Sequence, residues 1–117
     1  MKKRILLIDK DEFVLKSFEY KLKQSGFEVF IANNGFSGIK MIKKIKPDLI
    51  FLELILPPPG GFEILKEFGS HFNFIVCSEL KLEKDIQSAQ KMGAKEFVKK
   101  EGIPTNTIAK LAVKYLN

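Results

Sequence analysis

Short solid hydrophobic runs alternate along this chain with segments in which apolar residues recur every three or four positions. Solid runs are typical of strands buried on both faces of a parallel sheet, and the recurring positions are typical of amphipathic helices. The runs predict strands at residues 5–8, 29–32, 49–52, 74–77 and 97–98. A strand followed by a helix is therefore the unit that the chain repeats.

Five amphipathic segments fill the gaps between and after these strands. The first ends at Gly26, and the second, which Asn34 can cap, ends before Pro47. The fourth ends at Gly93, and the fifth begins near Thr105. Their apolar positions are, in chain order, Val14, Phe18 and Leu22; Ile39, Ile42 and Ile45; Phe62, Leu65 and Phe68; Leu82, Ile86, Ala89 and Met92; and Ile108, Leu111, Ala112 and Tyr115.

Strict alternation of strand and helix predicts an α/β fold with right-handed crossovers and helices on both faces of the sheet. We expect a doubly wound, flavodoxin-like sheet of five parallel strands in the order 2-1-3-4-5, with any site at the carboxyl ends of the strands. A length of 117 residues, 45% of them hydrophobic, is enough for one buried core. Residues 1–117 are therefore interpreted as a single domain.

Composition narrows the function classes. The net charge is +6, but only Arg4 among the 20 basic residues is an arginine, so sequence-specific nucleic-acid binding is not expected. Non-specific binding, which would depend steeply on salt, stays a hypothesis that rests on charge alone. The apolar run after the basic start stops at Asp9 and is too short for a signal peptide or a membrane span. Cys77 lies inside an apolar run, so we expect a buried thiol, no internal disulfide and a cytoplasmic protein.

Several stretches together resemble the CheY-like receiver domain of two-component response regulators. They are ILLIDKD at residues 5–11, PDLIFLELILP at 47–57 with GFE at 61–63, and GA at 93–94 before FVKK at 97–100. Each stretch is weak evidence by itself, but the set, in order and at these separations, covers essentially the whole chain. The resemblance implies a signalling domain that is not an enzyme in its own right.

The resemblance also implies a set of site residues. In the family two acidic residues after the first strand hold Mg²⁺, an aspartate after the third strand accepts a phosphoryl group, and a hydroxyl and a lysine at the ends of the fourth and fifth strands bind that group. The corresponding positions in this chain are Asp9, Lys10, Glu53, Ser78 and Lys100. Two of them depart from the pattern, because Lys10 replaces an acid and Glu53 replaces the phosphoacceptor aspartate.

The departures change the expected chemistry. Mg²⁺ needs oxygen ligands in near-octahedral geometry, and the ammonium of Lys10 has no lone pair to offer. Glu53 carries its carboxylate one carbon farther out than aspartate, which disturbs the in-line geometry of phosphoryl transfer. We therefore expect no cofactor, with Mg²⁺ binding lost or weak. Our hypothesis is that Lys10 stands in for the metal and that Glu53 pairs with Lys100.

Other polar residues near the predicted site have weaker claims. Asp11 is expected to cap the first helix, although Asp9 and Asp11 stay as weak metal candidates. Asp48 starts the strand that Glu53 follows, which places it about 17 Å away at the other end of the sheet. Glu79 and Glu101 add negative charge at the rim or pair with surface lysines.

Two aromatic or titratable side chains complete the candidates. Phe97 corresponds to the family's switch aromatic, and because it has no hydroxyl it is expected either to prefer the apolar pocket or to be a simple core residue. His71 falls in a polar connection and is assigned no role.

The leading hypothesis is a stand-alone, degenerate receiver domain that acts by phosphorylation-independent protein contact. The resemblance implies an interface on the fourth helix, fifth strand and fifth helix, and a partner that is a histidine kinase, a motility or polarity protein, or a second copy. One alternative is a receiver still phosphorylated on Asp9 or Asp11. Another is a small-ligand binder of the flavodoxin type, although the chain lacks a glycine- or hydroxyl-rich loop after the first strand.

Overall fold

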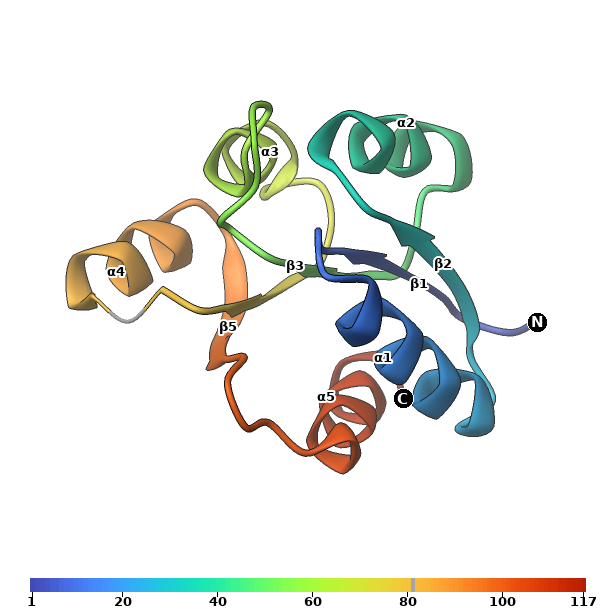
Figure 1. Cartoon of the computed structure of the whole chain (residues 1–117). Helices are drawn as coiled ribbons and strands as arrows, with labels where there is room; N and C mark the ends of the chain where they lie inside the picture. Colours follow the sequence, from blue (N-terminus) through green and yellow to red (C-terminus); the bar gives the residue numbers. More distant parts are fainter. Residues whose placement is uncertain (81) are drawn as a thin grey trace.

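A computed structural model describes residues 1–80 and 82–117, and it confirms the predicted architecture. Five parallel strands form one sheet in the order β2-β1-β3-β4-β5, and helices cover both of its faces (Figure 1). The strands are β1 (Arg4–Ile8), β2 (Glu28–Ala32), β3 (Leu49–Leu52), β4 (Phe74–Ser78) and β5 (Ala94–Lys99). The helices are α1 (Glu12–Gln24), α2 (Gly35–Ile45), α3 (Gly61–Phe68), α4 (Glu83–Lys91) and α5 (Thr105–Leu116).

Two helices begin at the caps that the sequence predicts. The Asp11 side chain accepts a hydrogen bond from the backbone N–H of Phe13 at 2.9 Å, and Asn34 accepts one from Ser37 at 2.8 Å. These side chains satisfy N–H groups that have no partner within the first helical turn. After α1 the chain turns at Gly26, whose φ of +95° favours glycine.

The core has two halves, one on each face of the sheet. Side chains of α1 and α5 pack against one face, where Leu22, Phe51 and Ile108 are buried. Side chains of α2, α3 and α4 pack against the other face, where Ile42 and Phe74 are buried. The central strands β1, β3 and β4 are covered on both sides, which explains why they read as unbroken apolar runs.

The structure corrects some details of the predicted elements. β5 begins at Ala94 rather than at residue 97, because Lys95 and Glu96 interrupt the apolar pattern of a strand that lies at the sheet edge. In the fourth helical segment Leu82 precedes α4 and is 57% exposed, so it is not part of the core stripe. In α1 the buried stripe begins with Leu15, while Val14 is only half-buried. Neighbouring residues point in different directions around a helix, so a buried face that is displaced by one residue accounts for the difference.

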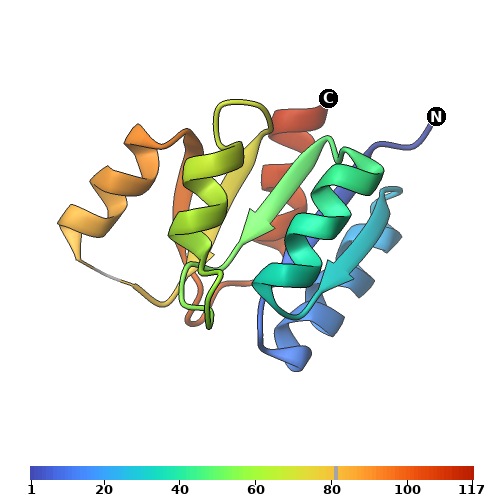
Figure 2. The same cartoon turned by 90° about the horizontal axis from the view of Figure 1, so that it is seen from above.

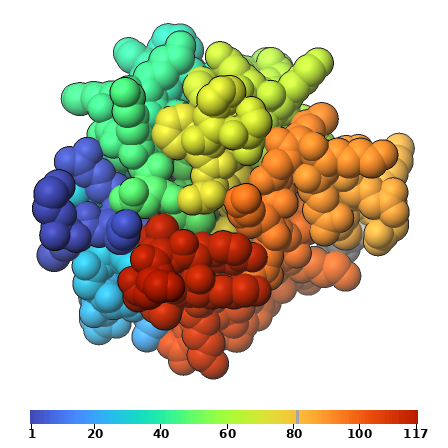
Figure 3. Space-filling model, turned by 180° about the vertical axis from the view of Figure 1, so that it is seen from behind, coloured from blue at the N-terminus to red at the C-terminus, as the bar shows by residue number. Residues whose placement is uncertain are grey.

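All five strands point the same way, so their carboxyl ends lie together at one end of the sheet. Ile8 pairs with Leu52, which makes residues 9 and 53 neighbours just beyond the ends of β1 and β3. Both termini of the chain lie at the opposite end of the sheet, where the strands begin, and they are close together (Figures 2 and 3). Within residues 1–80 and 82–117, none of the helices is long and apolar enough to cross a membrane.

Candidate functional site

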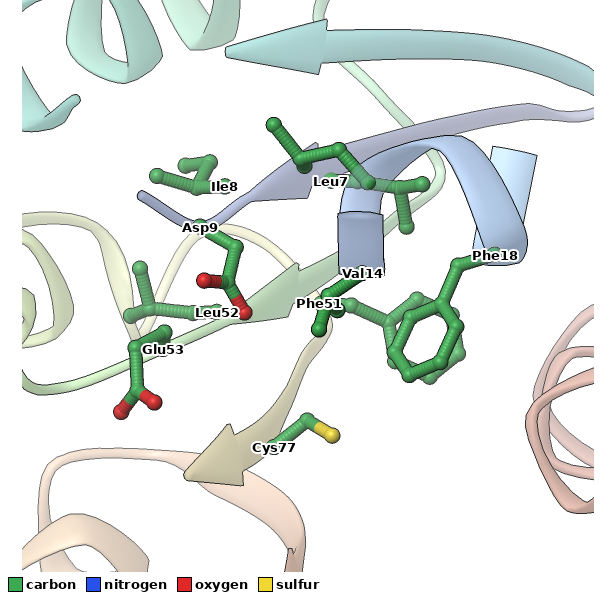
Figure 4. Close-up of a pocket in the computed structure, with 10 residues that line it drawn as sticks. Leu7, Ile8, Asp9, Val14, Phe18, Phe51, Leu52, Glu53 and Cys77 are labelled. Atoms are coloured by element: carbon green, nitrogen blue, oxygen red, sulfur yellow. The ribbon is translucent and has the colours of Figure 1, made fainter. Parts of the chain in front are cut away.

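Four polar side chains lie buried at the carboxyl ends of neighbouring strands. Asp9 follows β1, Glu53 follows β3, Ser78 ends β4 and Lys100 follows β5. Their exposed fractions are 5%, 1%, 0% and 7%, and they are the buried polar side chains of the described chain. Figure 4 shows Asp9 and Glu53 on one side of the apolar side chains of Val14, Phe18 and Phe51. The parallel sheet brings together residues that are up to 91 positions apart.

The ammonium of Lys100 lies between the two carboxylates. Its Nζ is 3.0 Å from Oδ2 and 3.2 Å from Oδ1 of Asp9, and 2.8 Å from Oε1 of Glu53. A third carboxylate, that of the exposed residue Glu79, is 3.5 Å from the same nitrogen. A buried ammonium and two buried carboxylates compensate one another here, since none of them could be buried alone at acceptable cost.

The second oxygen of Glu53 is also engaged. Oε2 accepts a hydrogen bond from the Ser78 hydroxyl and another, at 2.9 Å, from the backbone N–H of Ile55. Both oxygens of the carboxylate therefore face donors or a cation. To attack a phosphorus atom, Glu53 would first have to give up one of these contacts.

The two carboxyl groups have opposite pKa shifts. Burial raises the pKa of Asp9 above its ordinary value, and the bonds from Asp11 and Lys100 offset this only in part. For Glu53 burial also raises the pKa, but hydrogen bonds from Ile55, Lys100 and Ser78 together outweigh it and hold the pKa below the ordinary value. The pKa of Lys100 is raised, because its bonds to Glu53 and Asp9 exceed the opposing effect of burial.

These shifts predict unequal costs for removing the two charges. Glu53→Gln should lower the free energy of unfolding by about 2 kcal/mol, since hydrogen bonds to a charged group are lost. Asp9→Asn should lower the free energy of unfolding by less, because burial already disfavours the charge of Asp9. Because the pKa of Glu53 is lower in the folded state, its charge stabilises the fold fully above the ordinary pKa of 4.5. The loss of stability in Glu53→Gln should therefore be complete above pH 4.5 and should disappear as the pH falls through the lower pKa of the folded state. Urea unfolding between pH 3 and 7 measures both variants. An equal or larger deficit for Asp9→Asn would contradict this assignment.

Lys10 occupies a different place from the one proposed for it. Its side chain is exposed, and its Nζ donates a 2.8 Å hydrogen bond to the backbone carbonyl of Ile55. In the described part of the chain, Asp9 and Glu53 form their ion pairs with Lys100 and not with Lys10. The structure therefore gives no support to the hypothesis that Lys10 stands in for the metal beside the carboxylates, whereas the predicted pairing of Glu53 with Lys100 is present.

The arrangement does not fit a Mg²⁺ ion as it stands. A hard cation takes carboxylate and carbonyl oxygens. Here the oxygens of Asp9 and Glu53 face Lys100 and other donors, and the carbonyl of Ile55 accepts from Lys10. In the part of the chain that the structure describes, no group of three His, Cys, Asp or Glu side chains is placed to hold a metal ion.

The remaining sequence candidates lie outside this cluster. Asp11 caps α1, as expected, and its own N–H donates to Asp9 at 2.9 Å. Asp48 is at the other end of the sheet, where it accepts from the backbone N–H of Arg4 at 2.8 Å. His71 is exposed. Burial raises the pKa of the Cys77 thiol to about 12, so this side chain is an inert part of the core.

Phe97 is half-buried on β5 and packs against the core half formed with α2, α3 and α4. This position agrees with either of the two roles that the sequence leaves open.

Sequence reasoning missed the part played by the backbone of Ile55. Its N–H binds Glu53 and its carbonyl binds Lys10, so it joins the two departures from the family pattern. No side-chain signal could reveal this, since every residue carries the same backbone groups. Gly61 was a usable sign that the chain passes close to the backbone of Glu53, because a Cβ at this position would lie 2.6 Å from the carbonyl oxygen of Glu53.

The chain is similar to known signalling proteins over almost its whole length. The family model for the response regulator receiver domain matches residues 5–112. The chemotaxis protein CheY of Thermotoga maritima is 29% identical over 115 residues, which are 95% of this chain and 96% of that protein. CheY of Halobacterium salinarum is 30% identical over 104 residues, 86% of each chain. The regulatory protein PhoP of Bacillus subtilis is 29% identical over 114 residues, and this chain spans 48% of its length.

Solved structures agree on the fold. A CheY-like receiver domain protein from Methanospirillum hungatei has a TM-score of 0.88 and 24% identity, with 98% of this chain and 94% of that one covered. The chemotaxis protein CheY4 of Vibrio cholerae has a TM-score of 0.90 and 18% identity, with 99% and 100% covered.

Proposed function

We propose that this chain, which belongs to the response regulator receiver domain family, signals by protein contact without being phosphorylated. The observation that carries the proposal is the position of Lys100, whose ammonium lies between Asp9 and Glu53. The proposal involves no catalytic step, no resident metal and a cytoplasmic location.

The state of Glu53 supports the loss of phosphoacceptor activity. Its carboxylate is 1% exposed, and both oxygens already have partners. Phosphoryl transfer depends on a free nucleophile aligned to a fraction of an ångström. A longer side chain that is held in an ion pair lacks both the freedom and the in-line alignment that an aspartate would have.

The same contacts support a site that is permanently engaged. By resemblance to the family, the hydroxyl after β4 and the lysine after β5 bind the phosphoryl group of an activated receiver. Here the Glu53 carboxylate itself contacts Ser78 and Lys100. One negative charge on glutamate replaces the larger charge of a phosphorylated residue, which is −1.5 to −2. We infer that Glu53 substitutes for the modification, so that the output does not depend on a kinase reaction.

The output surface that we propose is the face of α4, β5 and α5. β5 is an edge strand, and two apolar side chains on or beside the flanking helices, Leu82 and Val113, are 57% and 45% exposed. Glu96 of β5 binds Tyr115 of α5 at 2.6 Å and Lys114 at 2.9 Å, which fixes the helix against the strand. Such a surface suits a protein partner, for which a histidine kinase, a motility or polarity protein, or a second copy are the candidates.

Treatment with a small phosphodonor and Mg²⁺ tests the proposal. We expect no mass increase in the intact protein and no hydroxylamine-labile adduct, because the nucleophile is paired and the oxygen ligands of a cation are occupied. A variant in which Asp11 is replaced by asparagine is the control for the alternative acceptor. A stoichiometric adduct on the wild type that persists in Asp11→Asn would place the phosphoryl group at the buried cluster and refute the proposal, and an adduct lost in Asp11→Asn would favour that alternative.

A further inference from the structure

The two edges of the sheet are built differently. β5 carries Lys95 and Lys99, both exposed, and its pairing with β4 contains a register shift between Phe74 and Ile75. Exposed lysines and irregular pairing are the usual means by which an edge strand avoids pairing with another chain. β2, at the other edge, pairs with β1 in an unbroken register. After Glu28 it contains only Val29, Phe30, Ile31 and Ala32.

The outward backbone groups of β2 can be identified from its bonds to β1. The N–H of Glu28 donates to the carbonyl of Lys3 at 2.9 Å, and the carbonyl of Ala32 accepts from the N–H of Asp9 at 3.2 Å. Bonding direction alternates along a strand, so residues 28, 30 and 32 face β1. The N–H and C=O groups of Val29 and Ile31 therefore point away from the sheet. Among the elements formed by residues 1–80 and 82–117, no strand pairs with this side of β2, which is the first strand in the sheet order (Figures 1 and 2).

Grooves lie on this edge at both ends of the strand, and their charges are opposite. The groove at the start of β2 is lined by two lysines, Lys2 and Lys23, by one carboxylate, Glu28, and by the apolar side chains of Phe27, Val29 and Phe30, so its net charge is positive. The groove at the end of β2 is lined by Glu12, Ile31 and Asn33, and the amide of Asn33 donates to Glu12 at 3.2 Å. Glu12 and Lys23 are at opposite ends of α1, which packs beside the strand.

We propose that two copies of this chain pair through β2, antiparallel and about a two-fold axis at Phe30. Val29 of each copy then lies opposite Ile31 of the other, and each such pair exchanges two backbone hydrogen bonds. The two-fold axis keeps α1 of both copies on the same face of the joined sheet. It therefore places Glu12 of one copy near Lys23 of the other, at both ends of the interface.

Charge complementarity favours a second copy over an unrelated peptide. An antiparallel pair matches the groove of net positive charge of one copy with the groove that contains Glu12 of the other, and it does so twice. The interface is independent of the proposed signalling face, because β2 and β5 are at opposite edges of the sheet. A dimer of this kind presents two signalling faces at its far ends, which increases the avidity for a partner with repeated sites.

The association should be weak, and it should slow the hydrogen exchange of two backbone amides. A five-residue strand makes a small interface, for which we expect a Kd of about 100 µM. Hydrogen exchange measured by NMR at 10 µM and 1 mM should then slow about fourfold at Val29 and Ile31, in proportion to the loss of monomer. The amide of Phe30 faces β1 and should exchange equally at both concentrations. Analytical ultracentrifugation over the same range gives the Kd.

Charge reversal on α1 tests the geometry without touching the core. Lys23→Glu and Glu12→Lys should each weaken association about tenfold, while the double variant should restore it, because the pairs across the interface regain opposite charges. Lys91→Glu on α4 changes the charge equally at the far edge and should have no effect. All three positions are exposed.

Three outcomes would overturn the proposal. The first is a monomer at 1 mM. The second is a dimer that Lys91→Glu weakens and Lys23→Glu does not, which would move the contact to the other edge. The third is a dimer in which the double variant is as weak as the single ones, or in which Val29 and Ile31 exchange unchanged. The phosphodonor experiment gives the same result in each case, so failure here does not count against the proposed function.

Discussion

Replacing Lys100 with methionine should lower the free energy of unfolding by about 3–5 kcal/mol, because it leaves two carboxylates buried without their cation. Methionine has nearly the same length and volume, so packing changes little. Asp9 and Glu53 are 5% and 1% exposed, and both are in contact with the Lys100 ammonium. Urea unfolding at pH 7 measures the loss. Lys99→Met, at the exposed neighbouring position, is the matched control and should change stability by about 0.5 kcal/mol or less.

The pH dependence of the variant separates charge from packing. Without the ammonium, burial raises the pKa of both carboxyl groups, and a raised carboxyl pKa means that stability falls as the pH rises through the shifted value. Lys100→Met should therefore approach wild-type stability near pH 4 and lose it towards pH 7. A deficit of the same size at both pH values would show that methionine disturbs packing and that the ion pair contributes little.

Combining Lys10→Asp with Glu53→Asp should turn an inert site into one that a small phosphodonor modifies almost completely. Lys10→Asp removes the ammonium from the Ile55 carbonyl and supplies a carboxylate beside Asp9, so that Mg²⁺ gains oxygen ligands. Glu53→Asp shortens the acceptor by one carbon and withdraws it from Lys100. Neither change alone provides both the cation and the nucleophile, so each single variant should stay unmodified.

Two measurements check this second prediction. Lys10→Asp should be stabilised by about 1.4 kcal/mol in 10 mM Mg²⁺ if its Kd is about 1 mM, whereas the wild type should not respond. Intact mass after phosphodonor treatment then shows whether the double variant is modified. Lys16→Asp with Glu53→Asp is the matched control, because Lys16 is an exposed lysine of α1 with the same charge. Modification of Glu53→Asp alone would mean that Lys10 does not prevent metal binding.

The amino-acid sequence determined the fold and the neighbourhood of the site. Solid apolar runs at β1, β3 and β4 report burial on both faces, and this property together with the alternating helices leaves few topologies besides a doubly wound sheet. The carboxyl ends of parallel strands lie at the same end of the sheet, so polar residues that directly follow such runs must meet there. The positions of Asp9, Glu53 and Lys100 could be read in this way without knowing a single distance.

Only the tertiary structure decided which groups touch within that neighbourhood. A lysine side chain is long and flexible, so the sequence could not show whether Lys10, which we expected to replace the metal, reaches the carboxylates. The structure places Lys100, which extends from the end of β5, between the carboxylates and turns Lys10 to the carbonyl of Ile55. Backbone groups are the same at every position, and hydrophobic periodicity reports which face of an element is buried but not whether a strand has a neighbour. For that reason the role of Ile55, and the backbone groups of β2 that face outward, became visible only in the structure, although the predicted strand order already placed β2 at an edge.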